Sequence, residues 1–222
     1  MMKIQSLGIL GLGSRSTLFY IKEINRLYHN KKSGYSTCPF KLWNANFDVI
    51  NNLLPQISNE LTVLVDNYLA ELQHLQVDAI LIPNITLHET IDRLSIIPKI
   101  IHPVHLTISK LKEDGFNEIV LLGSLHTMES NYLKAAFNKE NIVVVLPDAE
   151  ERLVIEDVRK HVYWETESEE LLKEYANVIK KYSANYAVVL ACTELSVVWD
   201  TVSSNVFDMS RIQIEIAVEN ID

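Results

Sequence analysis

Apolar runs of strand length alternate along this chain with stretches in which apolar residues recur every three or four positions. The runs predict β-strands at residues 4–10, 39–44, 79–83, 119–123, 142–146, 187–191 and 206–207. The three-and-four spacing predicts helices at residues 16–28, 58–75, 106–111, 128–137, 153–163 and 171–182. Strands that alternate with helices in this way are typical of an α/β fold, in which crossover helices join parallel strands.

The order of strands and turns repeats in the two halves of the chain. Gly11 and Asn84, which follow the first and third predicted strands, are 73 positions apart, and Gly123 and Cys192 are 69 positions apart in the second half. This spacing predicts two pseudo-symmetric lobes, residues 1–100 with 207–222 and residues 101–206, each a mostly parallel sheet flanked by helices. Chance similarity between βα units of a single sheet is the alternative. Because parallel sheets bind ligands at the carboxyl ends of their strands, we expect the site in a cleft between the lobes.

Composition and charge exclude several classes of protein. The 222 residues include 20 Lys and Arg against 29 Asp and Glu, a net charge of −9, and no basic stretch is dense enough to bind a nucleic acid backbone. No apolar run approaches the roughly 18 residues of a membrane span, and we expect residues 1–13 to form a buried strand rather than a leader. The two cysteines, Cys38 and Cys192, lack C-x-x-C spacing, which favours a reducing compartment, the cytoplasm.

Cys192 is the strongest candidate for chemistry. It lies between the buried strand that ends at Ala191 and a polar turn, Thr193-Glu194, that opens a helix. A thiol at a helix N-terminus often has a lowered pKa, and its thiolate is a capable base or nucleophile. The alternatives are an inert buried cysteine at position 192 and a simple helix cap at Thr193. Cys38, at the entry of a strand, has no such setting, and we interpret it as structural.

Asn84 holds in the first half the position that Cys192 holds in the second. Its amide can bind a ligand oxygen or an ammonium group, but it cannot remove a proton from carbon. Thr86 and His88 follow it. His88 is a candidate for titration, with a place on the surface of the next helix as the alternative.

Two Gly/Ser turns between strand and helix are candidates for anion binding. The first, at residues 11–17, exposes backbone amides beside Ser14, Arg15 and Ser16, and it lacks the last glycine of a dinucleotide fingerprint. The second carries Ser124, His126 and Thr127, for which helix capping is the alternative role.

Two further segments carry residues that sequence alone leaves open. His102-Pro103-Val104-His105 has no carboxylate or cysteine nearby in the sequence to complete a coordination set, so we expect no metal site. Arg152 is the one residue of the charged runs at 150–152 and 165–170 for which we expect a place near the site.

Several motifs together resemble the aspartate/glutamate racemase superfamily. They are Gly8-Ile9-Leu10-Gly11 with its Ser/Thr turn, Leu122-Gly123-Ser124 with Thr127-Met128-Glu129-Ser130, Pro147-Asp148, Ala191-Cys192-Thr193-Glu194-Leu195 and Val206-Phe207-Asp208. The resemblance implies two pseudo-symmetric lobes, no cofactor, a possible homodimer and two facing acid/base groups, usually cysteines. One group removes the α-proton of an amino acid, and the other delivers a proton to the opposite face.

The chain departs from the family at three positions. Asn84-Ile85-Thr86-Leu87-His88 stands where members usually have Cys-Asn-Thr or Thr-Asn-Thr, so the first acid/base residue is replaced by Asn84. Gln213 stands where members often have a histidine, and residues 44–55 contain no arginine of the kind that some aspartate-specific members use.

The resemblance and the residues predict a cofactor-independent racemase-type enzyme for an acidic amino acid of the aspartate/glutamate class, with Cys192 moving the proton. The residues expected to bind the substrate carboxylates are Ser14, Arg15, Ser16, Thr86, Thr127 and Thr193. Further candidates for the site are His88, His102, His126, Arg152 and Glu194. The alternatives are a single-cysteine decarboxylase or isomerase of a small dicarboxylate, and a binding protein that has lost turnover.

Overall fold

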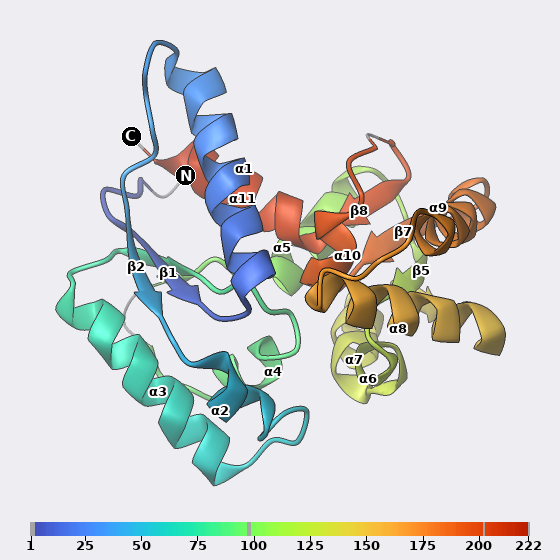
Figure 1. Ribbon diagram of the computed structural model, residues 1–222, viewed down its shortest axis with the longest axis horizontal. Coiled ribbons are helices and arrows are strands. Elements are labelled where there is room, and N and C mark those ends of the chain that lie inside the picture. Colours follow the sequence, from blue (N-terminus) through green and yellow to red (C-terminus); the bar gives the residue numbers. More distant parts are fainter. Residues whose placement is uncertain (1–2, 97–98, 202, 222) are drawn as a thin grey trace. The chain divides into compact units, whose positions relative to one another are not determined.

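The computed structural model describes residues 3–96, 99–201 and 203–221 (Figure 1). The contacts between its residues divide the chain into two units, which we call unit 1 (Met1–His102 with Gln213–Asp222) and unit 2 (Pro103–Ile212). Within the described residues, no helix combines the length and the apolar character needed to cross a bilayer.

Unit 1 is built on a four-stranded parallel sheet in the order β2-β1-β3-β4. Its strands are β1 (Leu7–Gly11), β2 (Phe40–Asn44), β3 (Ala79–Leu81) and β4 (Lys99–Ile100). Its helices are α1 (Ser14–Lys32), α2 (Phe47–Asn51), α3 (Asn59–His74) and α4 (His88–Ile91). The helix α11 (Met209–Asn220) begins in unit 2 and continues into unit 1.

Unit 2 is built on a second four-stranded parallel sheet in the order β6-β5-β7-β8. Its strands are β5 (Glu118–Leu122), β6 (Val143–Val145), β7 (Ala187–Leu190) and β8 (Val206–Asp208). Its helices are α5 (Pro103–Glu113), α6 (Leu125–Glu129), α7 (Asn131–Lys139), α8 (Ala149–Tyr163), α9 (Glu169–Ser183) and α10 (Thr193–Val197).

The two sheets have the same strand order, which confirms the predicted α/β class and its internal repeat. The alternative interpretation, chance similarity between βα units of a single sheet, is therefore wrong for the described residues. The units differ from the expected lobes at the C-terminal boundary, which was placed between 206 and 207. That position falls inside β8, and because β8 pairs with β7, the boundary lies at Ile212 instead.

Each unit has its own hydrophobic core. In unit 1, α3 packs against β1 and β2 (Figure 1) through Leu61, Val65, Leu69 and Leu72, which recur at helical spacing and are fully or almost fully buried. In unit 2, all four residues of β7 are buried and α8 and α9 contribute the apolar stripe above them. A parallel strand covered by helices reads as a continuous apolar run, which is why the sequence pattern located it.

Three elements differ from the predicted ones for local reasons. The helix expected at 128–137 is two helices, because Ser130 between them has extended backbone angles (φ −63°, ψ 157°). The strand β4 has only two residues, too few to produce an apolar run. The helix α11 begins directly after β8 and was not predicted.

Candidate active site

The carboxyl ends of the central strands lie side by side in each unit. In unit 2 the chain leaves β5 to one side, toward β6, and later returns to β7 on the other side of β5, so the strand order reverses between β5 and β7. Such a reversal point is where open parallel sheets bind ligands. The backbone N–H of Ala191 donates to the carbonyl of Leu122 at 2.7 Å, which holds the two turns together at this edge.

Gly123 permits the close approach of these turns. A Cβ at this position would lie 2.9 Å from Cγ2 of Thr127 and 3.2 Å from the carbonyl oxygen of Ala191. Both distances are shorter than ordinary carbon contacts, and the second neighbour is backbone, which does not swing aside. A glycine is therefore required where the α6 turn meets the residue that precedes Cys192.

Cys192 is the first residue beyond the β7 turn and caps the five-residue helix α10. It is 7% exposed, and its thiol donates to Oε2 of the half-buried Glu194 at 3.1 Å. Burial, followed by the charge and the hydrogen bond of Glu194, raises the pKa of the thiol well above its ordinary value. The expected lowering of this pKa is therefore wrong for the free protein, and the sulfur carries its proton beside a carboxylate.

Arg159 of α8 acts electrostatically on this thiol and is held by Glu156 of the same helix, and the sequence analysis missed both residues. Glu156 is buried and accepts hydrogen bonds from the backbone N–H of Leu125 at 3.0 Å and from Arg159 at 3.0 and 2.5 Å. The bond to Glu156 raises the pKa of Arg159, and the charges of Cys192 and Glu194 raise it further. The guanidinium in turn opposes the rise in the pKa of the Cys192 thiol. Arg159 is thus a counter-ion for a thiolate at position 192.

Of the residues predicted in the turn before α6, Ser124 has the alternative role of a helix cap. Ser124 accepts a hydrogen bond from the N–H of Thr127 at 3.1 Å, and the two hydroxyl oxygens are 2.8 Å apart. Thr127 and Thr193 are buried and His126 is half-buried. Arg152 forms an ion pair with Glu129 at 3.2 Å, at the other end of α6.

Asn84 occupies in unit 1 the place that Cys192 occupies in unit 2, in the turn after β3, the strand next to β1. Its Oδ1 accepts the N–H of Leu87 at 2.9 Å, and its backbone carbonyl accepts a hydrogen bond from Nδ1 of His88 at 2.8 Å. The oxygen of the amide is therefore engaged within the turn, and the amide nitrogen is the donor that remains for a ligand. His88 is fully buried, so its expected alternative place on a helix surface is wrong. Thr86 is half-buried within the same turn.

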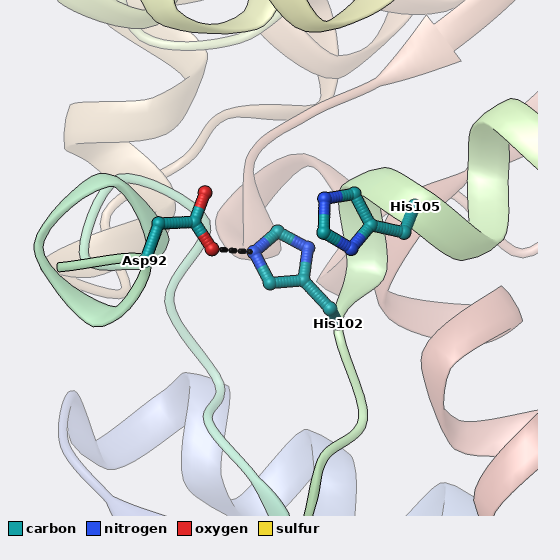
Figure 2. A group of neighbouring side chains, drawn as sticks. All are labelled: Asp92, His102 and His105. Atoms are coloured by element: carbon teal, nitrogen blue, oxygen red, sulfur yellow. Dashed lines mark ion pairs between the residues drawn. The ribbon is translucent and has the colours of Figure 1, made fainter. Parts of the chain in front are cut away.

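His102 has a carboxylate partner that sequence proximity did not reveal. Its Nε2 lies 3.2 Å from Oδ1 of Asp92, the residue after α4 (Figure 2). Its ring also meets the His88 ring edge to face, with centroids 4.7 Å apart. The argument that His102 lacks a nearby carboxylate is therefore wrong. His105, also drawn in Figure 2, belongs to unit 2, and we assign no metal to these side chains.

The first Gly/Ser turn has three predicted residues with different exposure. Ser14 is exposed, Arg15 is half-buried and Ser16 is buried in the first turn of α1. The hydroxyl of the next residue, Thr17, accepts the N–H of Leu12 at 3.0 Å and so closes the turn. No described side chain caps the start of α1.

Comparison with known proteins agrees with this arrangement. The model of the Asp/Glu/Hydantoin racemase family matches residues 9–217, nearly the whole chain. The chain belongs to the Asp/Glu/hydantoin racemase family. Among solved structures, a Yersinia pestis protein provisionally described as an Asp/Glu racemase has a TM-score of 0.80 at 25% identity, with 97% of this chain and 98% of that chain covered.

Two more distant members of the family show the same fold. An aspartate racemase homologue from Pyrococcus horikoshii has a TM-score of 0.77 at 19% identity and covers 99% of this chain and 98% of its own. Glutamate racemase from Francisella tularensis, solved with D-glutamate, has a TM-score of 0.63 at 14% identity and covers 97% of this chain and 80% of its own. The two-lobed racemase fold therefore holds across low sequence identity.

Proposed function

We propose that this racemase-family protein exchanges the α-proton of an acidic amino acid of the aspartate/glutamate class, without a cofactor, through Cys192. The observation that carries the proposal is the 3.1 Å contact between the Cys192 thiol and the Glu194 carboxylate at the carboxyl end of β7. A thiol that donates a hydrogen bond to a carboxylate is a proton-transfer pair, because the carboxylate can accept the thiol proton directly.

The exchange begins with the proton on sulfur. Glu194 takes this proton, and the resulting thiolate removes the α-proton of the substrate, which leaves the electron pair of the broken C–H bond on the substrate as a carbanion. Arg159 opposes the cost of negative charge on the sulfur, as does the backbone N–H of Glu194. The abstracted proton then passes from the sulfur to the half-buried Glu194 and exchanges with solvent. A solvent proton or deuteron returned through Cys192 to the same face regenerates the substrate with the solvent isotope incorporated.

Hydroxyl and amide groups are proposed to hold the substrate carboxylates. In unit 2 these are Thr127 and Thr193, which lie in the turns after β5 and β7. In unit 1 we propose Ser14, Arg15, Ser16 and Thr86. Hydrogen-bond donors fixed in place before the reaction stabilise the charge that develops on the carboxylate side of the carbanion.

Asn84 makes this exchange one-sided. Its amide has no titratable proton, and its oxygen is already held by the N–H of Leu87 at 2.9 Å. We therefore expect exchange with retention to be faster than inversion. A second candidate function is decarboxylation or isomerisation of a small dicarboxylate, because both reactions need one proton donor only and the protonated Cys192 would be that donor.

Deuterium exchange tests the proposal directly. The purified protein is incubated in D₂O with L- and D-aspartate and with L- and D-glutamate, and the α-proton signal is followed by NMR while chirality is followed by chromatography. We expect loss of the α-proton signal from one enantiomer, with slower inversion. Measurable binding of these amino acids without any exchange would disprove proton transfer and leave a binding protein.

Substitution of the two cysteines assigns the exchange to one sulfur. Cys192→Ala should lower the exchange rate by about 10²- to 10⁴-fold, the contribution expected of a positioned acid/base group. Cys38→Ala is the matched control, because Cys38 is buried in unit 1 at the entry of β2 and its thiol donates only to the neighbouring carbonyl of Pro39 among the described contacts. Exchange that survives in Cys192→Ala would contradict the role of Cys192.

A further inference from the structure

The short helix α10 is held at its C-terminal end by residues from other elements. Five residues make a helix that is not stable alone, and its last carbonyl groups have no partner within it. Tyr175 of α9 donates its hydroxyl to the carbonyl of Leu195 at 3.2 Å. Arg211 of α11 donates to the carbonyl of Trp199 at 3.0 Å and to that of Ser196 at 3.4 Å.

Asp208 connects this end of α10 to the start of α11. One oxygen, Oδ1, accepts the backbone N–H groups of Ser210 at 2.9 Å and Arg211 at 3.1 Å. The same oxygen lies 2.7 Å from the hydroxyl of Ser196, and the other oxygen lies 3.4 Å from Nε of Arg211. Asp208 therefore caps α11, orients Arg211 and binds α10 at once.

The Ser196 hydroxyl brings this network to the backbone of Cys192. Its oxygen lies 3.3 Å from the carbonyl oxygen of Cys192, which also accepts the N–H of Leu195 at 3.1 Å. Both Ser196 and Asp208 are buried, and a buried carboxylate is costly to a fold unless it is paired and hydrogen-bonded. The network thus ties an otherwise unstable helix to three neighbouring elements.

We propose that Asp208 and Arg211 are positioning residues for Cys192: they fix α10 so that the sulfur stays buried beside Glu194. This inference rests on the proposed function for its effect on turnover, but not for its effect on the sulfur itself. Both residues contact Ser196 of α10, and through this helix they act on the sulfur.

Alkylation by iodoacetamide, followed for each cysteine by mass spectrometry, measures how accessible and reactive each sulfur is and needs no substrate. Cys38, in unit 1, is the internal control in every sample. In Asp208→Asn and Arg211→Gln we expect Cys192 to react on the order of tenfold faster than in the parent, while Cys38 keeps its rate. The midpoint of its pH dependence should fall toward about 8.5, the ordinary value of an exposed thiol.

Two control variants show whether the effect on Cys192 is specific. Lys110→Gln, which removes an exposed ion pair with Asp114 in the same unit, should leave both cysteine rates unchanged. Arg211→Lys, which keeps the charge, should restore part of the protection of Cys192. If both cysteines react faster together, the variants loosen the fold as a whole and the specific role is wrong; unchanged rates and midpoint at Cys192 would overturn it as well.

Turnover separates this inference from the proposed function. Where the parent exchanges the α-proton, Asp208→Asn and Arg211→Gln should lower kcat with little change in KM, although the sulfur has become more reactive toward iodoacetamide. If the parent shows no exchange with any acidic amino acid, the proposed function fails, and the alkylation ratio still decides whether Asp208 and Arg211 position Cys192.

Discussion

The proton between Cys192 and Glu194 decides what this site can do. In the free protein the sulfur keeps it, because burial and the neighbouring carboxylate both raise the thiol pKa. The positive charge of Arg159 and the N–H of Glu194 oppose that rise without reversing it. Under the proposed function, a site in this state donates a proton at rest and acts as a base only after Glu194 accepts the thiol proton.

The substitution Glu194→Gln separates the effect of the carboxylate on the pKa of the Cys192 thiol from the effect of burial. Loss of the charge should lower the pKa of the Cys192 thiol, because Glu194 is the largest cause of the raised pKa after burial, and the pKa should stay above the ordinary value because burial remains. The α-proton exchange should nevertheless fall by about 10²- to 10⁴-fold, since the acceptor of the thiol proton is gone. The pH dependence of iodoacetamide alkylation at Cys192 gives the midpoint.

The control for this substitution is Glu150→Gln, an exposed carboxylate in the first turn of α8 in the same unit. It should change neither the midpoint nor the exchange rate. An alkylation midpoint in Glu194→Gln equal to that of the parent would show that the carboxylate does not influence the sulfur.

At the scale of elements, helix starts show which polar side chains stabilise the fold. The hydroxyl of Ser168 accepts the N–H of Leu171 at 3.2 Å and caps α9, whereas Ser130 precedes α7 without such a bond. Ser168→Ala should lower the free energy of unfolding by about 1 kcal/mol. Ser130→Ala should change the free energy of unfolding by only a few tenths of about 1 kcal/mol. Urea unfolding of the two variants makes the comparison, and equal losses would contradict the capping role.

Elements buried on both faces were predictable, and elements defined by pairing were not. The four residues of β7 form an apolar run that covering helices require, so its position followed from sequence. The two residues of β4 become a strand only because they pair with Ala79 and Ile80. The break at Ser130 was hidden because apolar spacing continues across it.

The candidate site also contains residues that the sequence predicted and residues that it did not. Cys192 and Asn84 lie two and three residues after buried strands, so their place at the carboxyl edge of each sheet was predictable from the sequence. Arg159 and Glu156 lie three positions apart on one helix and resemble a solvated ion pair in sequence. The signal that was available is the apolar pair Ile155 and Val158, which places Glu156 next to the buried face of α8.

Across the whole molecule, the two units repeat one strand order with different chemistry at the equivalent strand ends. Unit 2 presents a titratable sulfur there, and unit 1 presents an amide whose oxygen is already bound. Under the proposed function, only one of the two equivalent strand ends carries a transferable proton. This asymmetry is the structural reason to expect retention over inversion.

Each unit also contains one buried thiol, and the two thiols together should make the free energy of unfolding fall as the pH rises above neutral. Burial raises the pKa of Cys38 to about 11, and it raises that of Cys192 well above its ordinary value. The unfolded chain loses these protons near about pH 8.5, whereas the folded chain keeps them. Above that pH the unfolded state binds fewer protons, so the stabilising contribution present at neutral pH is lost as pH rises toward the folded pKa values.

The free energy of unfolding of the parent should therefore fall more steeply between about pH 7.5 and about pH 10 than that of the variant with both cysteines replaced by serine, which has no thiol to titrate. The lysines and tyrosines that titrate in the same range are common to both proteins, so the difference between the two slopes isolates the thiols. Urea unfolding at each pH measures it, and the single variants Cys38→Ser and Cys192→Ser divide the effect between the units. Parallel slopes in parent and double variant would mean that both thiols have the same pKa in the folded and unfolded chains, which would contradict the raised pKa values. A slope that is less negative in the parent than in the double variant would mean that the folded chain loses a thiol proton more readily than the unfolded chain, as a thiolate at rest would.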